Sequence, residues 1–134
     1  VNTLPQVISN IGPTVFPLIP CGSESGDMVT LGCLATGFNP SSLTFSWTKG
    51  GTALTNFIQY PAAQKGNVYN GVSQIEVTRQ DWNARENFQC AVIHAGGNAQ
   101  TDIINPRPLP TPKRPLTVRQ NVCFLCHCIV FQSV

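Results

Sequence analysis

The residues of this 134-residue sequence with the most distinctive chemistry are its six cysteines and two histidines. Thiolates and imidazoles bind metal ions, and paired cysteines form disulfides. The group Cys123-x-x-Cys126-His127 has the spacing of a haem attachment motif and, together with Cys128, of a loose zinc site. Because one short match in a mostly apolar tail is a weak signal, we favour disulfides over a metal or haem site and expect no cofactor.

Sets of residues typical of a catalytic centre do not occur in this sequence. We find no Ser-His-Asp set, no phosphate-binding loop and no pair of carboxylates in a suitable setting. We therefore predict that the protein is not an enzyme and that its cysteines and histidines serve structure or assembly.

Two of the cysteines lie inside runs in which apolar residues alternate with polar or small ones. These are Cys33 and Cys90, and such runs are typical of half-buried β-strands, in which every second side chain faces a core. Trp47 lies 14 residues after Cys33, and Cys90 lies 57 residues after Cys33. A Cys, Trp, Cys series at these intervals, with turn residues between short strands, is typical of an immunoglobulin-type sandwich.

The elements that position these residues can be placed from the same alternation. We expect strands at 14–19, 28–36, 43–48, 57–60, 72–78, 87–94 and 99–104, with a short helical crossing at 80–84. This predicts an all-β fold, a seven-stranded antiparallel β-sandwich with a disordered C-terminal tail; that the sandwich is immunoglobulin-like and C1-type is what the resemblance described in the next paragraph implies. The side chains expected in its core are Leu31, Phe45, Trp47, Ile75, Val77, Phe88 and Val92.

Two segments of the sequence resemble the signature of a known domain family. Residues 32–40 (GCLATGFNP) and 88–94 (FQCAVIH) resemble the two halves of the constant-type (C1) immunoglobulin signature. Residues 13–21 (PTVFPLIPC) are similar to the opening strand of the first constant domain of an antibody heavy chain. The resemblance covers residues 13–104 and implies a structural disulfide between Cys33 and Cys90, a structural His94 and a cis bond before Pro40. Phe88 departs from the pattern, which has tyrosine there.

The resemblance also implies a partner surface. In heavy chains a cysteine five residues after the phenylalanine of the first strand, here Cys21 after Phe16, forms the disulfide to the light chain. The sequence also leaves open a bridge from Cys21 to the tail cysteines, or no bridge at all. The residues expected to contact the constant domain of the light chain are Phe16, Leu18, Leu34 and Thr36. The alternative is that these are scattered surface residues that form no partner site.

Composition divides the sequence into three parts. Residues 1–12 are expected to be a linker, 13–104 the domain, and 105–134 a proline-rich linker followed by an apolar tail with three cysteines. The segment 1–104 contains four basic and all six acidic residues, whereas 105–134 contains four basic residues and no acidic one. The domain is therefore slightly acidic, and we predict no nucleic-acid surface.

Cysteine content indicates the compartment. Six cysteines in a small all-β protein are typical of an oxidising environment, so we expect a protein that is secreted or held at the extracellular face of the plasma membrane, after the endoplasmic reticulum. No run reaches the ~18 apolar residues of a membrane span. The first residues also lack a signal-peptide pattern, so a secretory protein would be represented here by a fragment.

Two functions fit these observations. The first is a constant domain of an antibody heavy chain, which pairs with the constant domain of a light chain, adjoins other domains of the heavy chain and supports antigen binding in adaptive immunity. The alternative is an immunoglobulin-type constant domain of a T-cell receptor or a histocompatibility-like receptor. The position of the interchain cysteine separates them, because a receptor domain would place it after the last strand.

Overall fold

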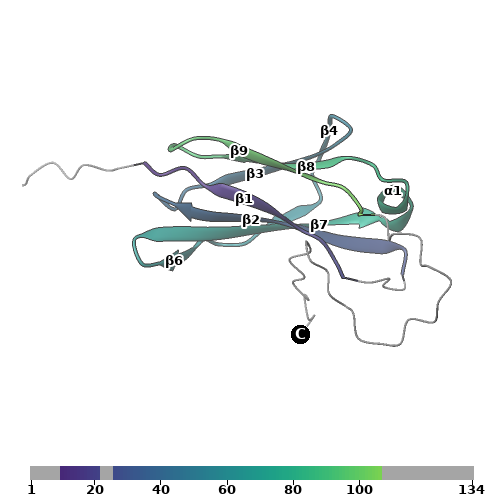
Figure 1. Ribbon diagram of the computed structural model, residues 1–134, viewed down its shortest axis with the longest axis horizontal. Helices are drawn as coiled ribbons and strands as arrows, with labels where there is room; N and C mark the ends of the chain where they lie inside the picture. Colours follow the sequence, from purple (N-terminus) through teal and green to yellow (C-terminus); the bar gives the residue numbers. More distant parts are fainter. Residues whose placement is uncertain (1–9, 22–25, 107–134) are drawn as a thin grey trace, which may run out of the picture.

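The computed structural model describes residues 10–21 and 26–106, which form two antiparallel β-sheets packed face to face (Figure 1). The first sheet has the strand order β1-β2-β7-β5, with β6 also paired to β7, and the second has the order β4-β3-β8-β9. The strands are β1 (Thr14–Leu18), β2 (Met28–Phe38), β3 (Thr44–Lys49), β4 (Thr52–Leu54), β5 (Phe57–Gln59), β6 (Ala63–Lys65), β7 (Val68–Thr78), β8 (Phe88–Ile93) and β9 (Ala99–Ile103). This architecture confirms the predicted immunoglobulin-like sandwich. The predictions for the tail fall on residues 107–134, outside the described residues.

The described residues contain nine strands, two more than the sequence predicted. One of these is β4, which follows a turn where Gly50 and Gly51 have positive φ angles (54° and 86°), so that the backbone folds back and Thr52 pairs with Lys49. The other is β6, which pairs with an early part of β7 that begins at Val68 and not at residue 72. A three-residue edge strand is too short to show alternation, which is why the sequence pattern did not reveal either one.

A disulfide joins the two sheets through the middle of the core. Cys33 of β2 is bonded to Cys90 of β8, and both residues are fully buried, which confirms the predicted pair. Closing a loop of 57 residues contributes about 4 kcal/mol of stability in the chain-entropy model. The seven other residues expected in the core all lie buried between the sheets: Leu31, Phe45, Trp47, Ile75, Val77, Phe88 and Val92.

Trp47 lies beside this disulfide, and its single polar atom has a partner. Trp47 pairs with Cys90 across β3 and β8. Its indole N–H donates to the hydroxyl of Ser73 at 2.9 Å, and that hydroxyl donates to the carbonyl of Ile58 at 3.0 Å. Because Trp47 and Ser73 come from opposite sheets, the first of these hydrogen bonds connects the layers through an otherwise apolar core, and the second joins β7 to the neighbouring strand β5.

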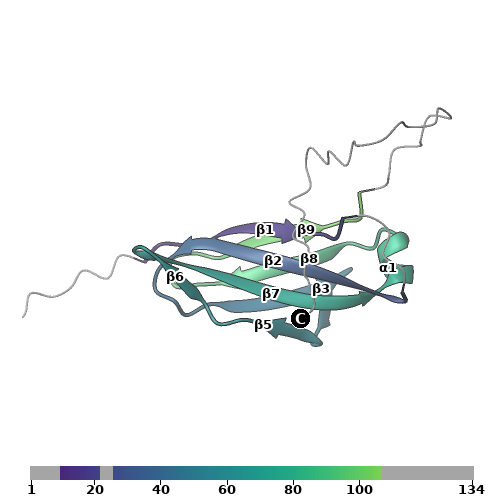
Figure 2. The same ribbon diagram turned by 90° about the horizontal axis from the view of Figure 1, so that it is seen from below.

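Helix α1 (Arg79–Asn83) closes one end of the sandwich, where the sequence predicted a helical crossing (Figure 2). Thr78 caps it, because its hydroxyl accepts the backbone N–H of Asp81 at 3.2 Å. The buried Trp82 side chain packs into the core and holds the helix in place. The backbone leaves the last strand at this same end, where the Asn105 amide donates to the Trp82 carbonyl at 3.1 Å.

His94 lies at the opposite end and is buried. Its Nε2–H donates to the carbonyl of Pro40 at 2.7 Å, and its Nδ1 accepts the backbone N–H of Gly96 at 2.9 Å. Both ring nitrogens are therefore occupied within the fold, in agreement with a structural histidine. The bond between Asn39 and Pro40 is cis, as the resemblance implied.

Candidate functional site

One face of the first sheet points away from the core and carries a row of large side chains across four strands. Phe16 lies opposite Leu34, and Leu34 lies opposite Val72. The N–H of Tyr60, which directly follows β5, donates to the Val72 carbonyl at 3.0 Å. Since the buried residues Cys33 and Ser73 alternate with these positions, the row Phe16, Leu34, Val72 and Tyr60 lies on the outward side.

A second row lies beside the first, towards α1. Leu18 is opposite Gly32, Gly32 is opposite Gln74, and Gln74 is opposite Ile58. Because Gly32 has no side chain, Leu18 rests on its backbone. A Cβ added at Gly32 would lie 3.1 Å from both Cβ and Cδ1 of Leu18. The glycine thus lets the leucine lie flat on the sheet.

We call the residues of these two rows the apolar face: Phe16, Leu18, Gly32, Leu34, Ile58, Tyr60, Val72 and Gln74. Ile58 is 55% exposed, Tyr60 43% and Phe16 37%. None of the eight residues is charged, and the nearest acid along the outward side of β7 is Glu76. Large apolar side chains that gather on one uncharged sheet face, instead of being scattered, are typical of a protein-docking surface.

The four residues predicted to contact a partner all lie on the outward side of β1 and β2. Phe16 and Leu34 are central to the apolar face, and Thr36 extends it by one row, where its hydroxyl donates to the Thr14 carbonyl at 3.4 Å. Leu18 is 3% exposed and packs on Gly32, so it has less area to offer than Phe16. Contact of these four residues with a partner stays a prediction.

Sequence reasoning missed three members of the apolar face, namely Val72, Ile58 and Tyr60. Alternation through Ser73 and Ile75 was enough to place Val72 on the outward side. Ile58 and Tyr60 required the knowledge that β5 pairs with β7, which is a contact between distant parts of the sequence. Strand partners of this kind are not encoded in local periodicity.

The apolar face contains one polar pair. The Tyr60 hydroxyl donates to Gln74 Oε1 at 3.0 Å, which leaves the amide nitrogen of Gln74 directed to other partners. Tyr60 and Gln74 are therefore the two side chains of the apolar face that carry hydrogen-bonding groups.

Cys21 lies at the margin of the apolar face, three residues after β1 ends at Leu18. The residue is exposed, in contrast to the two core cysteines. None of the three cysteines among the described residues is a free thiol. The place of Cys21 outside the core agrees with a covalent link to a segment or a polypeptide beyond the sandwich.

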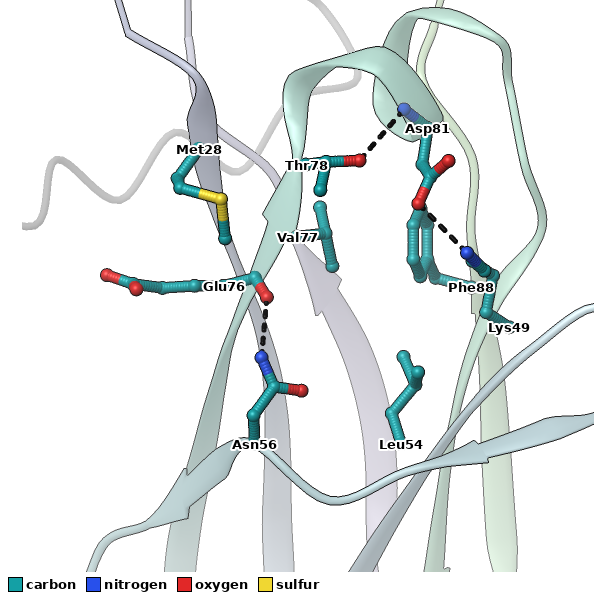
Figure 3. Close-up of a pocket in the computed structure, with 9 residues that line it drawn as sticks. All are labelled: Met28, Lys49, Leu54, Asn56, Glu76, Val77, Thr78, Asp81 and Phe88. Atoms are coloured by element: carbon teal, nitrogen blue, oxygen red, sulfur yellow. Dashed lines mark hydrogen bonds and ion pairs between the residues drawn. The ribbon is translucent and has the colours of Figure 1, made fainter.

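A shallow pocket of about 160 Å³ lies between the sheets at the α1 end (Figure 3). Leu54, Val77 and Phe88 form its apolar part, and Lys49 and Asp81 lie at its rim. The polar groups there already bond to one another. Lys49 Nζ lies 2.9 Å from Asp81 Oδ2, and the Asp81 N–H is used by the helix cap. The pocket therefore offers a ligand few unpaired groups, and we regard it as a helix-anchoring feature.

The Lys49–Asp81 pair shifts both pKa values in the direction that favours the ions. The hydrogen bond from Lys49, followed by that from Thr78, lowers the pKa of the Asp81 carboxyl below 3.8. The same hydrogen bond raises the pKa of the Lys49 ammonium above 10.5. Both side chains are about one-third exposed, so solvent screens the pair and its effect on stability is small.

No group of three or more His, Cys, Asp and Glu residues that could hold a metal gathers within residues 10–21 and 26–106. The cysteines and histidine considered for zinc or haem, from Cys123 to Cys128, fall beyond the part of the sequence that the structure describes. In that described part, no helix has the length and apolar character that crossing a bilayer requires.

Comparisons with known proteins agree with this geometry. Residues 15–97 match the family model of the immunoglobulin C1-set domain. The sequence is 33% identical over 112 residues to the secreted form of the Ig gamma-2A constant region of Mus musculus, a match that covers 82% of this protein and 32% of the relative. It is also 33% identical over 104 residues to the Ig mu constant region of Canis lupus familiaris, covering 75% of this protein and 23% of the relative. The protein thus spans a third or less of these curated relatives.

A solved structure shows the same fold. The "IgNAR antibody domain C3" superimposes with a TM-score of 0.67 at 24% sequence identity, over 72% of this protein and 98% of that domain. At this level of identity the likeness supports the sandwich architecture described above.

Proposed function

Because the protein belongs to the immunoglobulin C1-set family and is homologous to the constant regions of antibody heavy chains, we propose that it is a heavy-chain domain that pairs with the constant domain of a light chain. The observation that carries this proposal is the apolar face, which offers a second sheet an uncharged surface across β1, β2, β7 and β5. In this role the domain adjoins other domains of the heavy chain and supports antigen binding in a secreted or cell-surface antibody.

Burial of apolar surface supplies the driving force for such pairing. Each Å² of apolar area removed from water contributes about 25 cal/mol, from which the cost of ordering the two partners is subtracted. Ile58, Tyr60 and Phe16 have the most exposed area to lose on this face. Aromatic side chains are often the strongest contributors at an interface, so Tyr60 and Phe16 are the expected anchors.

Cys21 would then make the pairing covalent. It lies beyond the end of β1 at the edge of the apolar face, so a cysteine of the light chain that approaches this edge can reach it without disturbing the core. A disulfide at the rim adds little to specificity but prevents dissociation once the sheets have docked. In the assembled antibody, the partner of Cys21 would then be a cysteine of the light chain.

Co-expression with a light chain tests this function. We expect a one-to-one heterodimer in sedimentation velocity, and on a non-reducing gel we expect a heterodimer band that a Cys21→Ser variant lacks. The same variant should still form the non-covalent heterodimer, because the apolar face is unchanged. A protein that stays monomeric beside an intact light chain would contradict the pairing.

A further inference from the structure

The five strands of the first sheet contain two charged residues, and these have opposite signs. They are Lys65 of β6 and Glu76 of β7. Lys65 lies opposite Val68 of β7. Because side chains alternate along a strand and the odd-numbered positions from Gly71 to Val77 are buried, positions 68 and 76 both lie on the outward side. The apolar face therefore lies between one positive and one negative charge.

The two charges are too far apart to neutralise each other. Glu76 comes eight positions after Val68, which at about 3.3 Å per residue is a distance of about 26 Å along β7. Charges in solution are screened over about 8 Å at physiological salt. Strand β6 and helix α1 lie at opposite ends of the sandwich (Figure 2). The outward side of the first sheet thus has a negative end at α1 and a positive end at β6.

Glu76 has no partner within its own domain that would explain a carboxylate at this position. In the part of the sequence that the structure describes, its side chain makes no ion pair and no hydrogen bond, and the Asn56 amide donates to its backbone carbonyl. Its side chain points away from Lys49 and Asp81 (Figure 3). Strand β7 is an inner strand, where glutamate is disfavoured and no charge is needed to protect a sheet edge.

A domain that docks on the apolar face comes close to Glu76. Gln74 belongs to the apolar face, and Glu76 is the next outward position of β7, about 7 Å further along. A docking domain removes water from this carboxylate, which is unfavourable unless an opposite charge takes the place of the water. A sheet that covers the apolar face is therefore expected to present a basic side chain to Glu76.

Lys65 adds a direction to this requirement. It lies opposite Val68, two outward positions beyond Val72 of the apolar face. A partner with a basic group at one end of its docking sheet and an acidic group at the other meets opposite charges in one direction. In the reverse direction its charges would face Glu76 and Lys65 with like signs, and like charges repel.

We propose that Glu76 and Lys65 set the direction in which the constant domain of the light chain docks, with a basic residue of that domain facing Glu76 and an acidic residue facing Lys65. This rests on the proposed function, because the occupant of the apolar face is the light chain. Apolar burial drives the pairing, whereas the two charges select its direction and accelerate it. Charges at the rim of an interface act mainly on the association rate and its salt dependence.

Association kinetics of the full-length protein with a light chain test the role of Glu76. Glu76→Lys reverses the charge, and the control Asp102→Lys makes the same change on β9 of the other sheet. At about 50 mM salt we expect Glu76→Lys to associate at least threefold more slowly than wild type, and at about 1 M salt we expect equal rates. Asp102→Lys should match wild type throughout. Equal rates of the two variants at low salt would overturn the proposal.

Glu76→Gln guards against a folding defect, because it removes the charge and keeps the shape of the side chain. We expect its association rate at low salt to lie between those of wild type and Glu76→Lys. Lys65→Glu keeps a charge on the edge strand β6 but reverses its sign, so a role limited to edge protection would leave the rate unchanged. We expect this variant to slow association at least twofold.

Charge exchange across the interface identifies the residue opposite Glu76. Each basic residue on the docking sheet of the light-chain constant domain is replaced by glutamate in turn. We expect one replacement to slow association with wild type at least threefold and to return the rate of Glu76→Lys to within twofold of the wild-type pair. If no replacement restores the rate, the proposal is overturned.

The same measurements separate this proposal from the proposed function. If wild type and all variants pair with the light chain at one rate, the pairing stands and the role of the charges fails. If wild type does not bind the light chain, both fail. A protein that dimerises alone, loses the dimer in Glu76→Lys and regains it in Glu76→Lys/Lys65→Glu would have a second copy of itself as the occupant, which also overturns the proposal.

Discussion

Ser73 is a small polar residue at the centre of an apolar core, and its hydroxyl has two partners there. It accepts from the indole of Trp47 and donates to the carbonyl of Ile58, which joins the two sheets and edge strand β5. The N–H of a buried tryptophan usually has a hydrogen-bond acceptor. The burial of Trp47 therefore depends on Ser73. Alternation in the sequence places Ser73 in the core but does not show that it bonds to Trp47.

Replacing this hydroxyl tests its role. Ser73→Ala leaves the buried Trp47 N–H without an acceptor, so we expect the free energy of unfolding to fall by about 1–3 kcal/mol. Urea unfolding followed by tryptophan fluorescence measures it. Ser46→Ala, at an exposed position on the other sheet, is the control and should change stability by less than about 0.5 kcal/mol. Equal stabilities of the two variants would show that the bond is dispensable.

Helix α1 contains Asp81, whose ion pair with Lys49 makes a contribution to stability that depends on pH. The folded state lowers the pKa of Asp81, so the contribution of this carboxylate is present above pH 3.8 and is lost as the pH falls through the lowered value. The raised pKa of Lys49 sets the upper limit, since its contribution is lost as the pH rises through a value above 10.5. Between these limits both partners are ionised.

Asp81→Asn therefore has a pH-dependent effect. We expect the variant to be slightly less stable than wild type at pH 7, and the difference to shrink as the pH falls below 3.8, where the wild-type carboxylate also becomes protonated. Thermal unfolding at a series of pH values measures the difference. A difference that is the same at pH 7 and at about pH 2.5 would show that the lost hydrogen-bond geometry, and not the charge, matters.

Local pattern predicted some elements and not others, for a physical reason. Strands β2 and β8, of 11 and 6 residues, bury one face, so their alternation is visible in the sequence, and it placed Cys33 and Cys90 correctly. The edge strands β4 and β6 bury little and show no alternation. Their positions follow from turns and from pairing with distant strands.

The sequence likewise predicted only part of the candidate site. Resemblance and alternation placed Phe16, Leu34 and Thr36 on the outward side of two neighbouring strands. Pairing of β5 with β7 was needed to add Ile58 and Tyr60, and only the packing of Leu18 on Gly32 showed that this leucine is covered. Much of the apolar face thus depends on contacts that no local pattern contains.

At the scale of the whole molecule, one flank of the sandwich is apolar and the opposite flank is mostly polar. The outward side of β3 carries Thr44, Ser46 and Thr48, and its partner β8 adds one large apolar side chain, Ile93. Two flanks of such different composition are expected of a domain that presents only one of them to a partner. The charge distribution agrees, since the apolar face has no charged residue.

Pairing should therefore be visible in the stability of the whole domain. Binding to the native state alone stabilises it by mass action, so we expect the midpoint of thermal unfolding to rise, and the transition to sharpen, when light chain is present in excess over the dissociation constant. Circular dichroism of the domain with and without light chain measures this, after the signal of the light chain alone is subtracted. An unchanged transition would argue against pairing.

Two isoleucines with nearly equal exposure give the most direct test of the central claim that the apolar face is the pairing surface. Ile58 of β5 is 55% exposed on the apolar face, and Ile93 of β8 is 58% exposed on the other sheet. Titration calorimetry against the constant domain of the light chain should show Ile58→Glu weakening the dissociation constant at least about tenfold, because an unpaired carboxylate is buried, and Ile93→Glu leaving it unchanged. Equal affinities of the two variants, or a loss confined to Ile93→Glu, would contradict the account.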